Sequence, residues 1–376
     1  MKLIANIQLR PDKDQAASLG DTLVACNAAC NWLSQEGFRA GILRQFDLQK
    51  LAYRQVREKF GLTAQAAVRC IAKVADAYKL DKKTMRHFRP DSAQPYDERI
   101  IRFAKDDIVS IWTLGGRIKV PFVMGEYQRK IFAHRKGEVD LMHIRGKFYL
   151  ACVCDIDEPA LINTINVLGV DLGVVNIATD SDGKNYSGKK VNSSRVKFSH
   201  RRRNLQHKGT RSATRKLKKI AGKQARFQKD TNHCISKSIV ADAQRTAATI
   251  ALEDLGGIRK RVTARKHQRA RLANWGFAQL RSYISYKARR VGIPVVLVDP
   301  RNTSRMCPEC GHIDKANRKT RDEFVCVKCG LAGPADAIAA LNIRARALVN
   351  APMVAGMRAV KHTSLSYKPT ASAVGS

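Results

Sequence analysis

The sequence predicts a multidomain α/β protein whose C-terminal α/β domain carries a four-cysteine ribbon as an insertion. From residue 165 onward, hairpin-linked strands are followed by alternating helices and strands, which is typical of an α/β domain. Two closely spaced cysteine pairs interrupt this pattern between its last strand and its last helix. With 376 residues, 44% of them hydrophobic, the chain can bury the cores of two or three domains.

The N-terminal part of the chain predicts a helical lobe and a small barrel. Its first residues, MKLIANIQLR, alternate apolar and polar side chains like a strand. Residues 11–89 show helical apolar spacing and few strand signals, which predicts the helical lobe. Residues 90–163 are short β-rich pieces separated by glycines and turn residues. We expect residues 1–10 to join residues 90–163 in a β-barrel.

The α/β domain is expected over residues 164–303 and 335–352. Its predicted strands lie in INVLGVDLGVVNIATDSDGKNYS, with a hairpin turn at Asp182-Gly183, in TIALEDL, and in IPVVLVD. Helices are expected from about Arg195, and the last helix from about Asp336. Residues 304–334 form the inserted ribbon, and the Ser-, Ala- and Thr-rich residues 361–376 predict a disordered tail.

The net charge indicates a polyanionic partner. Lys and Arg number 69 against 32 Asp and Glu, a formal charge of +37, which makes the protein repel itself unless a polyanion neutralises it. Nucleic acid fits this requirement. An anionic membrane surface is the weaker alternative, because no apolar run approaches the roughly 18 residues of a membrane helix. The first residues lack the apolar core of a secretory signal, so we expect a cytoplasmic protein.

Four of the ten cysteines form two C-x-x-C pairs separated by 15 residues. Four thiolates at this spacing close a tetrahedral zinc site, with iron as the alternative, and leave no coordination position open. The metal is therefore expected to be one structural Zn²⁺, bound by Cys307, Cys310, Cys326 and Cys329. The other six are expected to be reduced core residues: Cys26, Cys30, Cys70, Cys152, Cys154 and Cys234.

Three acids stand at the ends of predicted elements. Asp171 ends the strand VLGVD, Glu253 lies near the end of TIALEDL, and Asp336 begins the last helix. Each acid alone is more often a cap or a turn residue. Together, clustered carboxylates repel one another unless cations bind between them. Two Mg²⁺ ions in such a cluster can clamp the attacking and leaving oxygens of a phosphodiester.

Runs of basic residues flank Glu253 in the sequence. Residues 195–229 hold 14 Lys and Arg and no acid, and RKRVTARKHQRAR adds seven more. Such runs are usually solvated helical faces, but next to the acid trio they predict a phosphate-binding channel. Aromatic residues make up only 6%, which favours a duplex bound through its backbone over stacked single-stranded bases. The candidate contacts are Arg201, Arg202, Arg203, Lys216, Lys218, Lys219, Arg259, Lys260, Arg261, Arg318, Lys319 and Arg321.

These motifs, taken in order, resemble the TnpB (OrfB) family of transposon-encoded RNA-guided nucleases, which are related to type V CRISPR effectors. The resemblance rests on GVDLG, LEDL, NWGFAQLRSYISYKA, VDPRNTSRMCPECGH, FVCVKCG and DAIAALNI. It covers residues 165–350. Upstream, only the layout of a strand, a helical region and a β-rich region matches.

The resemblance implies an RNase H-like (RuvC) nuclease domain with Asp171, Glu253 and Asp336 as catalytic acids on two Mg²⁺. It further implies that the four cysteines hold zinc in a target-nucleic-acid-binding ribbon, beside a helical recognition lobe and a wedge barrel. The implied partners are a guide RNA from the transposon end and double-stranded DNA flanked by a short motif, in a prokaryotic cytoplasm near the nucleoid. One departure concerns Ile338, where the family commonly has Asp or Asn.

Three alternatives share parts of this pattern. A miniature type V CRISPR effector has the same motifs and differs in genomic neighbourhood. A non-cutting RNA-guided regulator is disfavoured because all three acids are present, and a DNA-strand transferase is disfavoured by the family resemblance. The guide sequence, the adjacent motif, the cut positions, the oligomeric state and any protein partner are not encoded in a readable pattern.

Overall fold

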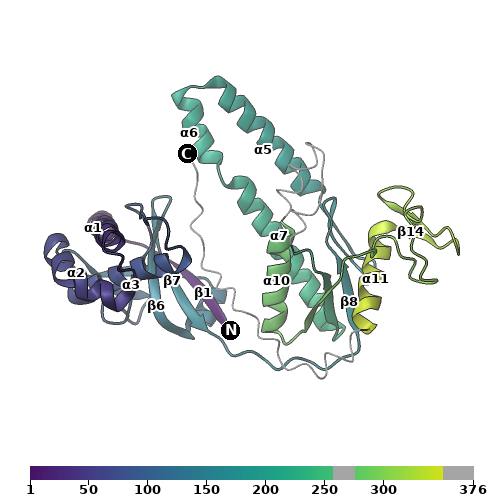
Figure 1. The fold of residues 1–376 in the computed structure, drawn as a ribbon, viewed down its shortest axis with the longest axis horizontal. Helices are drawn as coiled ribbons and strands as arrows, with labels where there is room; N and C mark the ends of the chain where they lie inside the picture. The colour runs from purple at the N-terminus through teal and green to yellow at the C-terminus, as the bar shows by residue number, and fades with distance from the viewer. Residues whose placement is uncertain (257–275, 350–376) are drawn as a thin grey trace. The chain divides into compact units, whose positions relative to one another are not determined.

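The computed structural model describes residues 1–256 and 276–349 (Figure 1). The chain divides after Asp157 into two compact units.

The first unit contains a seven-stranded antiparallel sheet with the N-terminal strand near its centre. The strand order is β2-β6-β7-β1-β5-β4-β3, so β1 pairs with β7 on one side and β5 on the other. The strands are β1 (Lys2–Leu9), β2 (Gln94–Tyr96), β3 (Ile101–Phe103), β4 (Ile108–Thr113), β5 (Gly116–Val123), β6 (Arg135–Ile144) and β7 (Lys147–Asp155).

The connection between the two edge strands shows that this sheet is curled. Strands β2 and β3 lie at opposite edges, yet only residues 97–100 separate them in the chain. Five backbone steps span at most about 19 Å, whereas a flat sheet of seven strands is about 29 Å wide. The sheet is therefore nearly closed, as expected of a small barrel.

Helices α1 (Lys13–Arg39), α2 (Gln45–Phe60) and α3 (Ala64–Leu80) precede most of the sheet, and the short α4 (Glu126–Phe132) interrupts it. Asp12 and Gln15 form a capping box at the start of α1, which satisfies N–H groups that the helix leaves unpaired. Buried residues of these three helices and of the sheet form one hydrophobic cluster. The predicted helical lobe and barrel therefore share a single core. Five of the free cysteines lie buried in it: Cys26, Cys30, Cys70, Cys152 and Cys154.

The second unit is built on a five-stranded mixed sheet in the order β10-β9-β8-β11-β12. Strands β8, β11 and β12 are parallel, while β9 and β10 run antiparallel to their neighbours. Their bounds are β8 (Val167–Asp171), β9 (Asn176–Asp180), β10 (Asn185–Ser187), β11 (Thr249–Glu253) and β12 (Val295–Val298).

Helices cover both faces of this sheet (Figure 1). Leu168 and Val170 of β8 pack with α7 (Lys223–Arg245) and α10 (Phe277–Arg290). Val167 of the same strand packs with α11 (Ala335–Val349) on the other face. Successive side chains of a strand point to opposite faces, so odd-numbered residues of β8 face α11.

Helices α5 (Lys189–Lys208) and α6 (Arg211–Ile220) extend away from the sheet in Figure 1. The prediction that helix begins at about Arg195 was wrong by six residues, because GKKVNSS has no apolar periodicity and α5 buries none of its residues. The prediction for Cys234 was also wrong, because this residue lies on the exposed side of α7.

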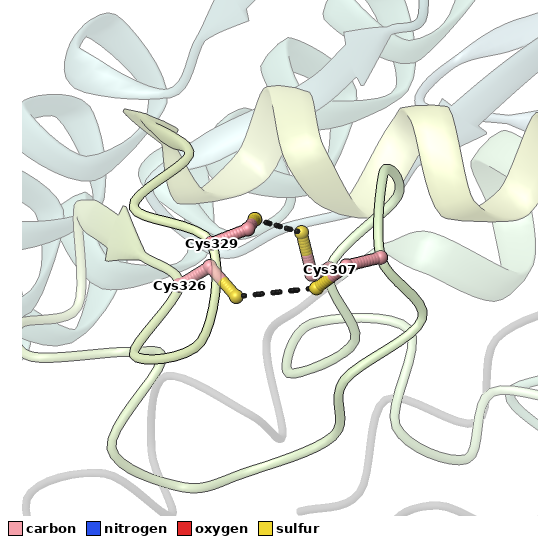
Figure 2. A group of neighbouring side chains, drawn as sticks. Cys307, Cys326 and Cys329 are labelled. Carbon is pink, nitrogen blue, oxygen red and sulfur yellow. Dashed lines mark hydrogen bonds between the residues drawn. The ribbon is translucent and has the colours of Figure 1, made fainter.

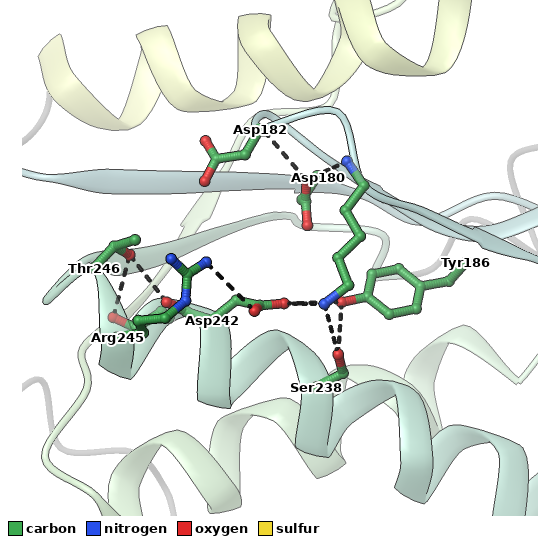
Figure 3. Close-up of polar contacts among 9 residues, drawn as sticks. Asp180, Asp182, Tyr186, Ser238, Asp242, Arg245 and Thr246 are labelled. Carbon is green, nitrogen blue, oxygen red and sulfur yellow. Dashed lines mark hydrogen bonds and ion pairs between the residues drawn. The ribbon is translucent and has the colours of Figure 1, made fainter.

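A polar cluster fixes the β9–β10 hairpin on α7 (Figure 3). Lys184 Nζ donates to Ser238 Oγ over 2.9 Å and pairs with Asp242. The N–H groups of Asp182 and Lys184 donate to Asp180 Oδ1 over 3.2 and 2.9 Å. The polar groups of this cluster bind one another, so we assign the cluster a structural role.

The inserted ribbon follows β12 and contains the two-stranded sheet of β13 (Glu323–Val325) and β14 (Ala332–Pro334). Its small core contains Cys307, Phe324 and Cys326, together with Ala335 and Ile338 of α11. The ribbon and the first turns of α11 therefore share a core.

Candidate functional site

The four ribbon cysteines converge from two turns (Figure 2). Their sulfurs all lie within 4.8 Å of one another, at 3.5 Å for Cys307–Cys329 and 3.6 Å for Cys310–Cys326. Tetrahedral zinc with Zn–S bonds of 2.3 Å requires sulfurs about 3.8 Å apart, whereas disulfide sulfurs are only about 2.05 Å apart. The cluster therefore fits one zinc ion and not a pair of disulfides.

Both cysteine turns have the same backbone geometry. Gly311 N–H donates to Cys307 O and Gly330 N–H donates to Cys326 O, each over 3.0 Å. The two glycines have φ of +68° and +79°, values that favour glycine over other residues. The glycine after each C-x-x-C pair is thus a sequence signal for the metal-binding turn.

Asp171 and Glu253 are brought together by the parallel pairing of β8 and β11. Each is the last residue of its strand, and Leu252 is paired with Val170 immediately before them. Both acids lie two residues beyond positions that face α11, since Ala251 packs with that helix and Gly169 touches it. Asp336 lies in the first turn of α11, so all three acids lie on one face at one edge of the sheet.

Gly169 allows α11 to approach β8 closely, a feature that the sequence analysis missed. A Cβ at this position would lie 2.2 Å from Ala340 O and 2.6 Å from Arg344 N. Backbone atoms cannot give way as a flexible side chain can. The signal is the glycine two residues before Asp171 within a run of otherwise apolar strand residues.

We therefore expect Gly169→Ala to displace α11, and with it Asp336. The overpacked variant should lose about 1–3 kcal/mol of unfolding free energy and most of any activity that depends on the three acids. Thermal unfolding and activity assays check this. Gly20→Ala is the matched control, because nothing lies within 4 Å of a Cβ there. A Gly169→Ala protein that is as stable and active as the unchanged protein contradicts the close-approach argument.

The electrostatics of the acids favour bound cations. Burial, followed by the charges of Glu253 and Asp336, raises the pKa of Asp171 to about 8, against the opposing effect of Arg318. Burial also raises the pKa of Glu253, which is 8% exposed, while the Thr303 hydroxyl and Arg346 lower it. Divalent cations relieve this repulsion, and carboxylate oxygens are the ligands that Mg²⁺ prefers. The three carboxylates are not gathered as tightly as the four sulfurs.

Asp336 has two partners that the sequence analysis missed. Asn176 Nδ2, from β9, donates to Asp336 Oδ2 over 2.9 Å, and Arg318 of the ribbon lies 3.6 Å from Asp336 Oδ1. The sequence grouped Arg318 with phosphate contacts, but its guanidinium lies at the acid cluster. Ile338, the departure from the family pattern, packs into the ribbon core. The side-chain amide that contacts Asp336 is instead that of Asn176 in β9.

The remaining predicted nucleic-acid contacts are exposed wherever they are described. Six lie on α5 and α6, and two lie in the ribbon: Arg201, Arg202, Arg203, Lys216, Lys218, Lys219, Lys319 and Arg321. Arg259, Lys260 and Arg261 lie outside the described residues. Within the described ranges, no helix is both long and apolar enough to cross a membrane.

Comparison with solved structures defines the fold class. The chain superposes on a Cas12f1–sgRNA–target DNA complex with a TM-score of 0.59 and 16% identity, covering 88% of this chain and 83% of the other. At this identity the likeness shows a Cas12f-like fold.

Family models and relatives then confirm the TnpB (OrfB) resemblance. Residues 151–256 match the model of a probable transposase, OrfB_IS605, and residues 277–343 match the Cas12f1-like TNB domain. The TnpB-like protein MJ0751 of Methanocaldococcus jannaschii is 27% identical over 65% of this chain and 92% of its own length. The CRISPR-associated endodeoxyribonuclease Cas12f1 of Sulfoacidibacillus thermotolerans is 32% identical over 53% of this chain. That match spans 50% of the Cas12f1 relative.

Proposed function

We propose that this protein is an RNA-guided DNA endonuclease with an RNase H-like (RuvC) domain over residues 164–303 and 335–352. One observation carries the proposal: Asp171 and Glu253 end neighbouring parallel strands on the face where α11 presents Asp336. Such a carboxylate cluster suits phosphodiester hydrolysis with two divalent metals. Relatives bear the names endodeoxyribonuclease and putative RNA-guided DNA endonuclease.

In this proposal, the three acids would hold two Mg²⁺ ions, which would supply charge stabilisation for the attacking water and the leaving 3′ oxygen. Asp171 must lose its proton to act as a ligand. Asn176 fixes the orientation of Asp336 through its amide. Arg318 balances the negative charge of the cluster from the ribbon side and lies where it can also meet a DNA phosphate.

Guide RNA and double-stranded DNA are the proposed partners. Helices α5 and α6 together carry many exposed cations and few buried residues, which suits contact with a nucleic-acid backbone. Pairing with the guide would supply most of the sequence specificity. A short motif beside the target would be read by the proposed recognition lobe (residues 11–89) and wedge barrel (1–10 and 90–163). The ribbon (304–334) would guide DNA to the acids, in the cytoplasm of a prokaryotic cell.

The second candidate is a miniature CRISPR effector, which the Cas12f1-like ribbon match favours. Genomic neighbourhood, a transposon end or a repeat array, would separate the two classes, because both share these motifs.

The experiment that tests the class is to express the chain with its native downstream DNA and sequence the RNA that copurifies. We expect one discrete RNA ending in a variable guide segment, whose flanking sequence separates a transposon end from a CRISPR repeat. An Asp171→Asn control should copurify the same RNA, because this acid is not needed for RNA binding. Random cellular RNA, or none, rules out guided cleavage.

A further inference from the structure

The loop that leads from β12 into the ribbon contacts both the acid site and the last helix. Asn342 of α11 is fully buried, and its Nδ2 donates to Thr303 O and to Met306 O, each over 2.7 Å. A carboxamide nitrogen carries two hydrogens, so both are used on this loop. Met306 directly precedes the first cysteine of the ribbon. Asn342 therefore clamps the loop at two carbonyls.

Thr303 connects this loop to Glu253, one of the three acids. Its side chain is 2% exposed, and its hydroxyl donates to Glu253 Oε1. Pro300 O lies 3.0 Å from the same hydroxyl, but a hydroxyl has one hydrogen. Because hydrogen bonds to a charged acceptor are about twice as strong as neutral ones, the Glu253 carboxylate takes that hydrogen when it is ionised, the state that metal binding requires.

Glu253 depends on this contact more than Asp336 does on any single partner. Among the residues described, Thr303 is the one whose hydrogen bond reaches the Glu253 carboxylate, whereas Asp336 is held by both Asn176 and Arg318. Arg346, one turn beyond Asn342 on α11, donates to Asp299 O at the start of the loop. The last helix thus holds the loop at its beginning, middle and end.

We infer that Thr303 is a positioning residue that orients the Glu253 carboxylate for divalent metal binding, and that Asn342 holds Thr303 in place. The loop thereby ties the zinc ribbon to the proposed nuclease site. This inference rests on the proposed function for the role of Glu253. Hydrogen bonds to a metal-binding carboxylate matter because they fix the direction of its lone pairs.

The first test measures Mn²⁺ binding to the full-length, zinc-loaded protein by calorimetry, without DNA. Mn²⁺ favours the same carboxylate ligands as Mg²⁺. Thr303→Val removes the hydroxyl and should weaken Mn²⁺ binding about 10- to 100-fold, the usual effect of losing such a contact. Thr303→Ser keeps the hydroxyl and should restore the affinity. Unchanged affinity in Thr303→Val, or no rescue in Thr303→Ser, overturns the inference.

Thr179→Val is the matched control. Thr179 is 5% exposed and pairs across the sheet with Asp171, yet its hydroxyl has no hydrogen-bond partner among the described residues. Losing this hydroxyl should leave Mn²⁺ affinity unchanged. An equal loss of affinity in Thr179→Val would mean that any buried substitution here disturbs the site, and would overturn the specific role of Thr303.

Two double variants test the order of the contacts. If Asn342 acts through Thr303, then Asn342→Leu should weaken Mn²⁺ binding alone but add nothing to Thr303→Val. Thr303→Val should likewise cause no further loss of Mn²⁺ affinity in a Glu253→Gln background, because the hydroxyl acts through Glu253. Additive losses of Mn²⁺ affinity in either double variant contradict the proposed order, in which Asn342 holds Thr303 and Thr303 orients Glu253.

The binding measurement separates this inference from the proposed function. If the protein binds Mn²⁺ in a Glu253- and Thr303-dependent way but cuts no guided target, the nuclease proposal fails and the positioning role stands. If it cuts DNA while Thr303→Val binds Mn²⁺ normally, the positioning role fails and the nuclease proposal stands.

Discussion

Asp171→Asn is expected to abolish DNA cleavage and, at the same time, to raise the melting temperature of the protein. Under the proposed function Asp171 is a ligand of the catalytic metals, and its loss should remove several kcal/mol of transition-state stabilisation, a rate loss of about a thousandfold or more. The stability gain follows from the raised pKa of Asp171, caused first by burial and then by Glu253 and Asp336. A neutral amide avoids that repulsion.

The stability difference should depend on pH with a defined sign. The pKa of Asp171 is about 8 in the folded protein and about 3.9 in an unfolded chain. The folded state therefore holds a proton that the unfolded state has lost, and unfolding free energy falls as pH rises from about 4 to about 8. In magnesium-free buffer, the advantage of Asp171→Asn over the unchanged protein should be small near pH 4 and largest above pH 8.

Cleavage assays and thermal unfolding at several pH values check both parts of this prediction. Asp182→Asn is the control, because Asp182 is an exposed hairpin acid that pairs loosely with Arg344; it should cut DNA normally. Guided DNA binding should persist in Asp171→Asn. Residual cleavage near the normal rate, or loss of binding together with cleavage, contradicts the role proposed for Asp171.

Cys326→Ser is expected to remove the zinc and, with it, cleavage. Cys326 is 2% exposed and belongs to the small ribbon core. Structural zinc contributes about 10–16 kcal/mol in small zinc-binding domains, far more than this core can supply. When the ribbon unfolds, Arg318 is no longer held beside Asp336. The ribbon residues that follow Met306 also lose their fixed position.

Zinc content and cleavage are the measurements, with one zinc per chain expected in the unchanged protein. Cys234→Ser is the matched control, because Cys234 is an exposed thiol outside the cluster; it should change neither quantity. The N-terminal unit has its own core and should keep its unfolding transition in Cys326→Ser. Full zinc content in that variant would show that the metal is not held by these four cysteines.

The cysteine cluster and the acid cluster both belong to the second unit of this chain. Here the two clusters are physically joined, because Ile338 and Ala335 of α11 pack in the ribbon core while Asp336 between them faces the acids. Helix α11, which carries the third acid, therefore also contributes residues to the core of the ribbon. A substitution that unfolds the ribbon should therefore displace Asp336, and a substitution that shifts α11 should disturb the ribbon core.

The sequence by itself determined the features that depend on neighbouring residues. Cysteine pairs with two residues between them, and the glycines that follow, define the turns of the proposed zinc site. Apolar runs that end in Asp171 and Glu253 define strand ends, and DAIAALNI defines the start of the last helix. Local spacing suffices for these because turn and strand geometry are set within a few residues.

Only the tertiary structure decided which distant residues meet. Asn176 reaches Asp336 across 160 positions, and Thr303 reaches Glu253 across 50. Gly169 became informative only once α11 was seen to press against β8. The start of α5 was missed because it buries none of its residues, so no apolar period marks it. Local patterns record how each segment buries its own apolar side chains, whereas contacts between polar groups depend on how the segments assemble.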